Sequence, residues 1–472
     1  LYNLANPPLL LGKQAEAEPH YHQALTLYQG IPNTEEQQAK CLPLLATSLA
    51  TRGKLADAEP HYRQALTLYQ GIPNTEDNQA ICLFNLANTL HELGQPANAE
   101  PYYHQALTLY QDIPNTEKNQ ANCLLLLATT LRELGQLADA EPYYRQALTL
   151  YQDIPNTEEN QATCLKNLAN TLDDLGKPAQ AEPYYRQALT LYQTLPGTER
   201  DQATCLYSLA TTLSKLNKLA QAEPYYHQAL TLYQDIPNTE EEQANCLLNL
   251  ATTLFVLDKL AQAESHYRQA LTLYQTLPNT QRDQAHCLLN LAATLYNLGR
   301  GVETEPLYRQ AIHLCEGTSG TEQIHATCLQ HLASDVTSKG EGHLREALEL
   351  YDHARALYEK VADSDADQAH CLTQQADITT HLGHLPDAEA LYHQALTLYE
   401  HTNTPIKHAT CLQHLATCLA HTPNRTTDTL TTLNHALDIL THTNTTQTAP
   451  QRPTILHSLT HTHLINGDHF PA

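Results

Sequence analysis

Residues 162–202 read ATCLKNLANTLDDLGKPAQAEPYYRQALTLYQTLPGTERDQ, and near-copies of this text precede and follow it. The cysteine at the third position of this sequence reveals the length of the repeat. Eight such cysteines are spaced 41 residues apart, and two more follow at intervals of 43 and 40. They are Cys41, Cys82, Cys123, Cys164, Cys205, Cys246, Cys287, Cys328, Cys371 and Cys411. Repetition of this kind is typical of solenoids, in which each repeat stacks on the next.

Each repeat has two stretches with the apolar spacing of an amphipathic helix. The apolar face of the first helix is made of Leu165, Leu168, Ala169, Leu172 and Leu175. That of the second helix is made of Ala181, Tyr185, Ala188, Leu189 and Tyr192. Both sets recur mainly at intervals of three and four residues, which places each set on one side of a helix. The sequence therefore predicts a pair of helices in every repeat.

Turn residues separate the predicted helices. Gly176 follows the first helix, where a left-handed residue commonly ends a helix, and Asn217 and Asp258 replace it in the next two repeats. Thr157, followed by two glutamates, is expected to cap the next first helix with its side chain. Thr239 with Glu242 matches the spacing of a capping box.

The repeat can be followed to both ends of the sequence. Leu1 falls within a first helix and Ala472 within a second helix. We expect a single solenoid over residues 1–472, with about ten complete helix pairs between two cut repeats. Residues 401–472 form divergent repeats that are rich in Thr and His.

The repeat resembles the tetratricopeptide repeat. The matching residues are Leu165, Leu168, Ala169, Leu172, Gly176, Ala181, Tyr185 and Ala188, although Leu165 stands where a Trp is common. The repeat is longer than usual, and its sequence is similar to that of the kinesin-light-chain subclass. This subclass also forms sensor arms of bacterial signalling ATPases. The resemblance covers essentially the whole chain. It implies an all-α fold, a right-handed superhelical solenoid of antiparallel helix pairs.

Composition narrows the classes of partner. The chain has 51 acidic and 26 basic residues, a net charge of -25, which argues against binding to a nucleic-acid backbone. No run of 18 apolar residues occurs, so membrane insertion is not expected. No phosphate-binding loop, nucleophile elbow or zinc-protease motif is present, so we expect neither an enzyme nor a cofactor.

The cysteines are expected to be buried packing residues, reduced and not bound to metal. Equivalent positions of stacked helix pairs lie about 10 Å apart, which is too far for a disulfide. Ligands 41 residues apart do not converge on a zinc ion as short motifs do. Many free thiols favour a cytoplasmic over an extracellular location. The pair His461 and His463 is not expected to bind metal, because residues two apart point to different faces of a helix.

The resemblance implies that the first helices line a concave groove. Counting Ala162 as position 1, we compared positions 5, 6, 9 and 12 between repeats, because residues that vary there are not fixed by packing. The predicted groove residues are Phe84, Asn85, Asn88, Leu125, Lys166, Asn167, Asn170, Tyr207, Leu248, Asn249, Phe255, Leu289, Asn290 and Tyr296. Exposed aromatic residues in a groove indicate an interface, and asparagine amides pair with a peptide backbone. Alternatively, the aromatic rings fold back onto their own repeat, and the asparagines bond a neighbouring helix.

Three functions remain open at this stage. The first is a scaffold that binds a protein or peptide in the groove. The second is a structural protein whose near-identical repeats assemble with copies of itself into a fibre or tube. The third is a sensor arm of a larger signalling ATPase or protease.

Overall fold

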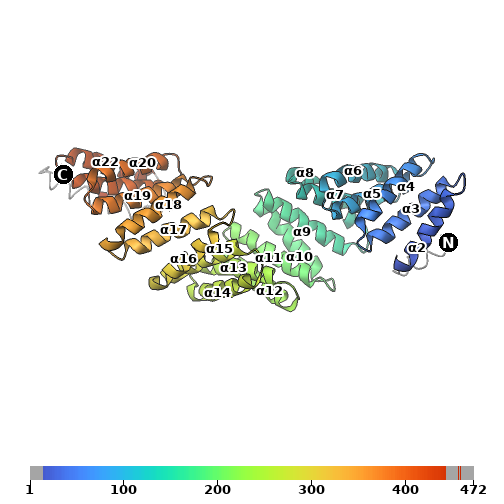
Figure 1. Ribbon diagram of the computed structural model, residues 1–472, viewed down its shortest axis with the longest axis horizontal. Coiled ribbons are helices and arrows are strands. Elements are labelled where there is room, and N and C mark those ends of the chain that lie inside the picture. Colours follow the sequence, from blue (N-terminus) through green and yellow to red (C-terminus); the bar gives the residue numbers. More distant parts are fainter. Residues whose placement is uncertain (1–13, 443–454, 457, 459–472) are drawn as a thin grey trace. The chain divides into compact units, whose positions relative to one another are not determined.

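The computed structural model describes residues 14–442, 455, 456 and 458, and the regular structure of these residues is entirely helical. The chain divides into two compact units, Leu1–Thr239 and Glu240–Ala472. Within each unit, helices pack in consecutive pairs, as Figure 1 shows. The predicted all-α solenoid of helix pairs is therefore confirmed, whereas a single solenoid over the whole chain stays a prediction.

The described part of the unit Leu1–Thr239 starts at a second helix and continues with complete pairs. Its first helices are α3 (Glu35–Ala50), α5 (Glu76–Glu92), α7 (Glu117–Glu133), α9 (Glu158–Asp174) and α11 (Glu199–Lys215). Its second helices are α2 (Gln14–Gln29), α4 (Leu55–Gln70), α6 (Pro96–Asp112), α8 (Leu137–Gln152), α10 (Pro178–Tyr192) and α12 (Leu219–Asp235). Each first helix packs on the second helix before it and on the second helix after it.

The unit Glu240–Ala472 repeats the same arrangement. Its first helices are α13 (Glu240–Val256), α15 (Gln281–Asn297), α17 (Glu322–Thr337), α19 (Asp365–His381) and α21 (Pro405–Ala420). Its second helices are α14 (Leu260–Thr276), α16 (Thr304–Cys315), α18 (Leu344–Tyr358), α20 (Leu385–Tyr399) and α22 (Thr426–His442). Short 3₁₀ turns, η1 (Gly301–Glu303) and η2 (Glu341–His343), precede α16 and α18.

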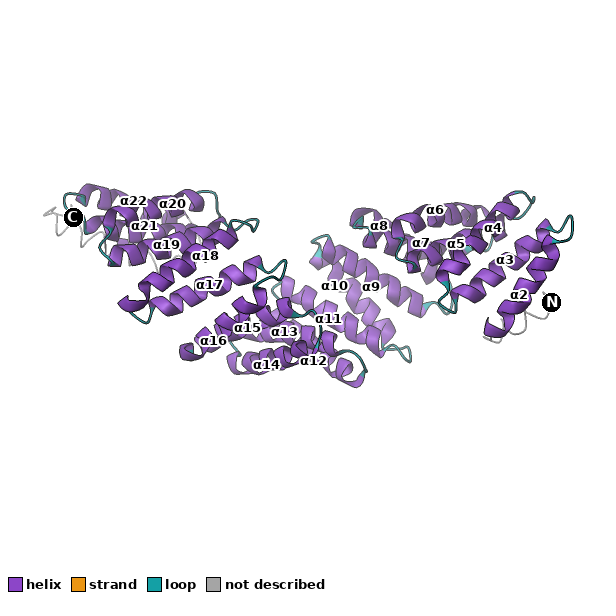
Figure 2. Cartoon of the chain, viewed as in Figure 1, coloured by secondary structure: helices purple, strands orange, loops and turns teal. Residues whose placement is uncertain are grey.

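The predicted apolar faces form the core. Leu168 and Leu172 of α9 are fully buried, and so are Ala181 and Tyr192 of α10. Alanines allow the paired helices to approach closely, and tyrosines fill the space between successive pairs. The short loops that join these helices are visible in Figure 2.

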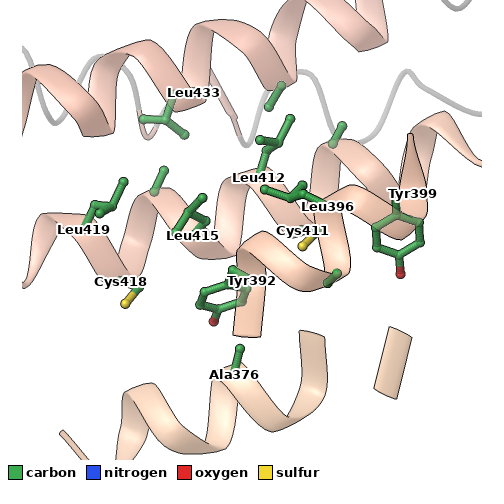
Figure 3. Close-up of a cluster of buried hydrophobic side chains, with 14 of the residues drawn as sticks. Ala376, Tyr392, Leu396, Tyr399, Cys411, Leu412, Leu415, Cys418, Leu419 and Leu433 are labelled. Atoms are coloured by element: carbon green, nitrogen blue, oxygen red, sulfur yellow. The ribbon is translucent and has the colours of Figure 1, made fainter. Parts of the chain in front are cut away.

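The core continues into the divergent repeats. Figure 3 shows Tyr392 and Tyr399 of α20, Leu412 of α21 and Leu433 of α22 in one buried cluster. Leu433 occupies the place that a tyrosine holds in earlier repeats, and it remains buried. The Thr- and His-rich repeats therefore keep the helix pair as far as His442. The predicted cut first helix within 1–13, residues 459–472 of the last cut repeat, and the pair His461 and His463 lie outside the described residues.

The turn between the helices of a pair is left-handed, as predicted. Gly176 has a φ of 71°, and the residues that replace it, Asn217 and Asp258, have φ values of 56° and 59°. Only glycine adopts this conformation without cost, and Asn and Asp are among the few residues that tolerate it. The same backbone requirement therefore explains three different residue types at one position.

The predicted side-chain cap at Thr157 is wrong. Thr157 stands at the N-cap position of α9, but its side chain makes no capping hydrogen bond. Its hydroxyl donates instead to the carbonyl oxygens of Tyr151 (2.7 Å) and Ile154 (2.8 Å) at the end of the preceding helix. The side-chain amide of Gln161 donates to the Tyr151 carbonyl and to the Thr157 hydroxyl, both at 3.1 Å. The last carbonyl groups of a helix need hydrogen-bond donors, just as its first N–H groups need acceptors. Here the next repeat supplies those donors, so these bonds join two repeats.

Candidate functional site

The aromatic residues at position 5 pack on their own repeat. The ring of Phe84 lies edge-to-face on Tyr103, with 6.1 Å between the centroids, and Tyr207 makes the same contact with Tyr226 at 6.0 Å. The rings of Phe84 and Tyr207 are only partly buried. These two residues therefore present one surface to the core tyrosine of the second helix and leave another exposed on the first helix.

The other residues at position 5 are less accessible. Leu125 and Leu248 are buried, and Leu289 is partly buried. Lys166 forms an ion pair with Asp201 at 2.5 Å, and its Nζ lies 5.4 Å from the centroid of the Tyr192 ring. The lysine charge is therefore already compensated within the protein.

Three asparagines at position 6 have side-chain amides that are not used in packing. Asn85, Asn167 and Asn290 are partly exposed, and their side-chain amides make no hydrogen bond within the part of the chain that the structure describes. Asn249 occupies the same position in α13. An amide that carries both donors and an acceptor, and has no partner, is able to pair with an extended peptide backbone.

The asparagines at position 9 are engaged inside the repeat. The hydroxyl of Tyr103 donates to Oδ1 of Asn88, and that of Tyr185 donates to Oδ1 of Asn170, both at 2.6 Å. Threonine takes the same role in other repeats, for example Thr129 with Tyr144 at 3.1 Å. Position 9 therefore satisfies the hydroxyl of a buried tyrosine.

The residues at position 12 differ between the two units. Tyr296, near the end of α15, is 63% exposed, and Phe255, near the end of α13, is partly exposed. In the unit Leu1–Thr239 the same position carries Ala50, His91, Arg132, Asp173 and Ser214, and Arg132 forms an ion pair with Asp174 of the next first helix at 3.1 Å. Tyr296 is therefore the most accessible apolar member of the predicted groove.

The second helices carry a network of charged residues that was not predicted from the sequence. Glu182 accepts bonds from Arg186 at 2.9 Å and from Lys218 of the next repeat at 2.6 Å. Arg186 also donates to the hydroxyl of Tyr225 at 2.7 Å. The hydrogen bonds from Lys218 and Arg186 hold the pKa of Glu182 below its ordinary value. The partners lie 36 and 39 residues apart, so a comparison at nearly one full period would have indicated them.

Two further observations concern the predictions about metals and membranes. Within the described residues, no group of three His, Cys, Asp or Glu side chains is placed to hold a metal ion, and all twelve cysteines are buried. Burial raises the pKa of the Cys164 thiol to about 12. Among the described helices, none is both long and apolar enough to cross a membrane.

A family model decides the membership of this chain. The model of the tetratricopeptide repeat matches residues 1–71, 78–153, 160–235, 201–276 and 242–312, which together make up more than half of the sequence. The chain belongs to the tetratricopeptide repeat family. A second tetratricopeptide model matches residues 44–99. No curated protein is significantly similar to the chain in sequence.

Several solved structures are distantly similar. BtubC (BKLC) from P. vanneervenii is 24% identical, with 48% of this chain and 91% of that chain covered and a TM-score of 0.42. The apo form of RapI is 14% identical, with 59% and 97% covered and a TM-score of 0.43. A putative kinesin light chain with nearly identical TPR-like repeats from Podosopora anserina is 16% identical, with 44% and 98% covered and a TM-score of 0.38. Membership of the family rests on the family model.

Proposed function

We propose that this chain is a non-catalytic scaffold that binds a protein or peptide along its first helices. The observation that carries the proposal is the difference between positions 6 and 9. The amides of Asn85, Asn167 and Asn290 have no partner in the described residues, whereas those of Asn88 and Asn170 accept bonds from core tyrosines. Packing therefore explains Asn88 and Asn170 but not Asn85, Asn167 and Asn290.

The aromatic residues of the same helices support the proposal. Phe255 is partly exposed near the end of α13, and Tyr296 is exposed near the end of α15. Aromatic side chains are over-represented among the residues that dominate binding energy at interfaces. An extended ligand that bonds the amides through its backbone would gain apolar contacts from these rings.

The two asparagine sets give a matched experiment. Peptides selected from a display library of short unstructured peptides serve as the probe. Replacing Asn85, Asn167 and Asn290 by Ala is expected to weaken the selected peptides by about tenfold or more, whatever their sequence, without a change in thermal stability. Replacing Asn88 and Asn170 by Ala, the control, is expected to lower stability, because it leaves two tyrosine hydroxyls without an acceptor.

A second set tests the aromatic residues. Replacing Phe84, Tyr207, Phe255 and Tyr296 by Ser is expected to leave most of the helicity intact and to reduce peptide binding. The proposal would be contradicted if the asparagine variant and the aromatic variant both bind peptides normally, while substitutions on the second helices abolish binding. Assembly with copies of the same chain would then be the better explanation.

A further inference from the structure

The unit Leu1–Thr239 joins the C-terminal ends of neighbouring first helices by ion pairs. Arg132 of α7 pairs with Asp174 of α9 at 3.1 Å, and Asp173 of α9 pairs with Lys215 of α11 at 2.7 Å. In each pair, one residue stands at position 12 of a repeat and the other at position 13 of the next repeat. Between α7 and α9 and between α9 and α11, these two positions are therefore filled by charges that compensate one another.

The unit Glu240–Ala472 has apolar residues in the corresponding region. Positions 12 and 13 of α13 are Phe255 and Val256, and position 12 of α15 is Tyr296. Val256 is 61% exposed, and Val302 in η1 is 92% exposed. Gly301 lies next to the Tyr296 ring, since a Cβ placed on it would be 3.9 Å from that ring. We call Phe255, Val256, Tyr296 and Val302 the apolar patch.

The patch lies on elements that adjoin one another. Helices α13 and α15 are in contact, and η1 packs on the end of α15. Neighbouring first helices are about 10 Å apart, so the four side chains fit beneath a single helix of a partner. Exposed aromatic and aliphatic residues grouped in this way mark interaction sites on soluble proteins.

The charges near the patch indicate the kind of partner. Arg300 is held by Glu264 at 2.9 Å and by Glu303 at 2.7 Å, and Lys339 is held by Glu305. By contrast, Asp258, two residues after Val256, makes no ion pair within the described part of the chain. The loop that follows α13 beside the patch therefore carries an uncompensated negative charge.

We propose that the apolar patch docks an amphipathic helix of a partner protein, with large apolar residues on one face and Lys or Arg beside them. The apolar face covers Phe255, Val256, Tyr296 and Val302, and the basic residues approach Asp258. This inference rests on the proposed scaffold function, because Phe255 and Tyr296 belong to the predicted groove. It adds the position of one contact and the chemistry of its partner.

The ion pairs of the other unit supply the test variant. Phe255→Arg with Asn297→Asp, and Tyr296→Arg with Ser338→Asp, place at positions 12 and 13 the residue types that Arg132 and Asp174 have there. The fourfold variant replaces patch residues by an arrangement that the fold already accommodates. Its circular dichroism and thermal midpoint are expected to match those of the parent chain.

Two synthetic helical peptides serve as probes. They share one leucine face and one Trp, and their polar residues are all lysine in one peptide and all glutamate in the other. Because the chain contains no Trp, fluorescence of the indole reports the peptide alone. We expect the lysine peptide to bind at least about tenfold more tightly than the glutamate peptide, and the fourfold variant to lose about tenfold for the lysine peptide.

Each other outcome overturns the inference. Equal binding of the two peptides would show that the partner does not need basic residues. Unchanged binding of the lysine peptide to a well-folded fourfold variant would show that the apolar patch is not the docking site. If sedimentation shows a dimer of the parent chain that the variant abolishes, a second copy occupies the patch instead. If the fourfold variant keeps the lysine peptide while the asparagine variant has lost the library peptides, this inference fails and the scaffold function stands.

Discussion

The thiol of Cys164 donates a hydrogen bond to the main-chain carbonyl oxygen of Tyr144, 3.0 Å away in the second helix of the preceding repeat. Both residues are fully buried. The same bond joins Cys41 to Tyr21, Cys123 to Tyr103, Cys205 to Tyr185 and Cys287 to Tyr267. A small apolar residue with a weak donor suits this junction, because the helices approach closely there.

Native thiol reactivity follows from this arrangement. Cys164 is fully buried, and burial raises the pKa of its thiol to about 12, so both access and thiolate formation are suppressed. We expect labelling of Cys164 and Cys205 to be slow in the native protein and fast after unfolding in guanidinium. Mass spectrometry of the labelled peptides measures the two rates. Rapid labelling of either residue in the native protein would contradict the packing role.

The tyrosine of the second helix contributes through its ring and its hydroxyl. Tyr185 is buried, and its hydroxyl donates to Asn170 at 2.6 Å. Tyr185→Ala is expected to cost about 3–5 kcal/mol, and Tyr185→Phe only about 1 kcal/mol. Because each repeat contacts mainly its neighbours, unfolding of the Ala variant should also become less cooperative. Guanidinium unfolding that shifts as one sharp transition, or does not shift, would count against a local solenoid core.

A buried glutamine in α19 predicts a stabilising substitution. Gln375 is 4% exposed at a position where the neighbouring repeats have Leu332 and Leu415. Its amide donates to Asp352 at 2.8 Å, but its Oε1 is buried and has no partner among the described residues. Gln375→Leu is therefore expected to raise the unfolding free energy of this region by about 1–2 kcal/mol.

The control for this substitution is the reverse change in the preceding repeat. Leu332→Gln puts an amide into an apolar site without a prepared acceptor and should destabilise the same unit. Chemical denaturation of both variants gives the comparison. A Gln375→Leu variant that is less stable than the parent would show that the bond to Asp352 outweighs the unsatisfied oxygen.

The periodic features of the fold were predictable from the sequence. Leu168, Tyr185 and Gly176 recur because every repeat meets the same neighbours, so packing fixes their identity. The roles of Thr157 and Asn170 were not predictable from local spacing. The hydroxyl of Thr157 turns back to the helix before it, and Asn170 bonds a tyrosine 15 residues later in the other helix.

The candidate site was predictable only as a set of variable positions. Repeat comparison identified Phe255 and Asn167 as variable, but it did not separate Asn167 from Asn170. That distinction depends on which amide a tyrosine hydroxyl reaches, and this is a property of three-dimensional packing. The ion pair of Arg132 with Asp174 was missed for a similar reason, because its partners lie 42 residues apart on different helices.

Acid is expected to destabilise the unit Glu240–Ala472 before the other unit. Burial holds the pKa values of His331, His370 and His408 below the ordinary value, whereas in the described part of Leu1–Thr239 only His61 shows such a lowering. A histidine with a lowered folded pKa binds more protons when unfolded. The unfolding free energy therefore decreases as the pH falls through about 6.5, the ordinary value, towards the folded pKa.

One histidine acts in the opposite direction. The hydrogen bond to Asp377 raises the pKa of His414, so its contribution is fully present below about pH 6.5 and is lost as the pH rises through the folded pKa. Burial also lowers the pKa values of His286 and His325 in this unit, so five histidines with lowered pKa values outweigh this one, which keeps the expected sign. Hydrogen exchange at pH 7 and pH 5, corrected for the intrinsic rate, measures the protection of each helix. His331→Phe keeps a ring where His331 stacks on Tyr308 and should reduce the acid sensitivity of α16 and α17. Loss of protection that begins in α3–α12 would contradict this assignment.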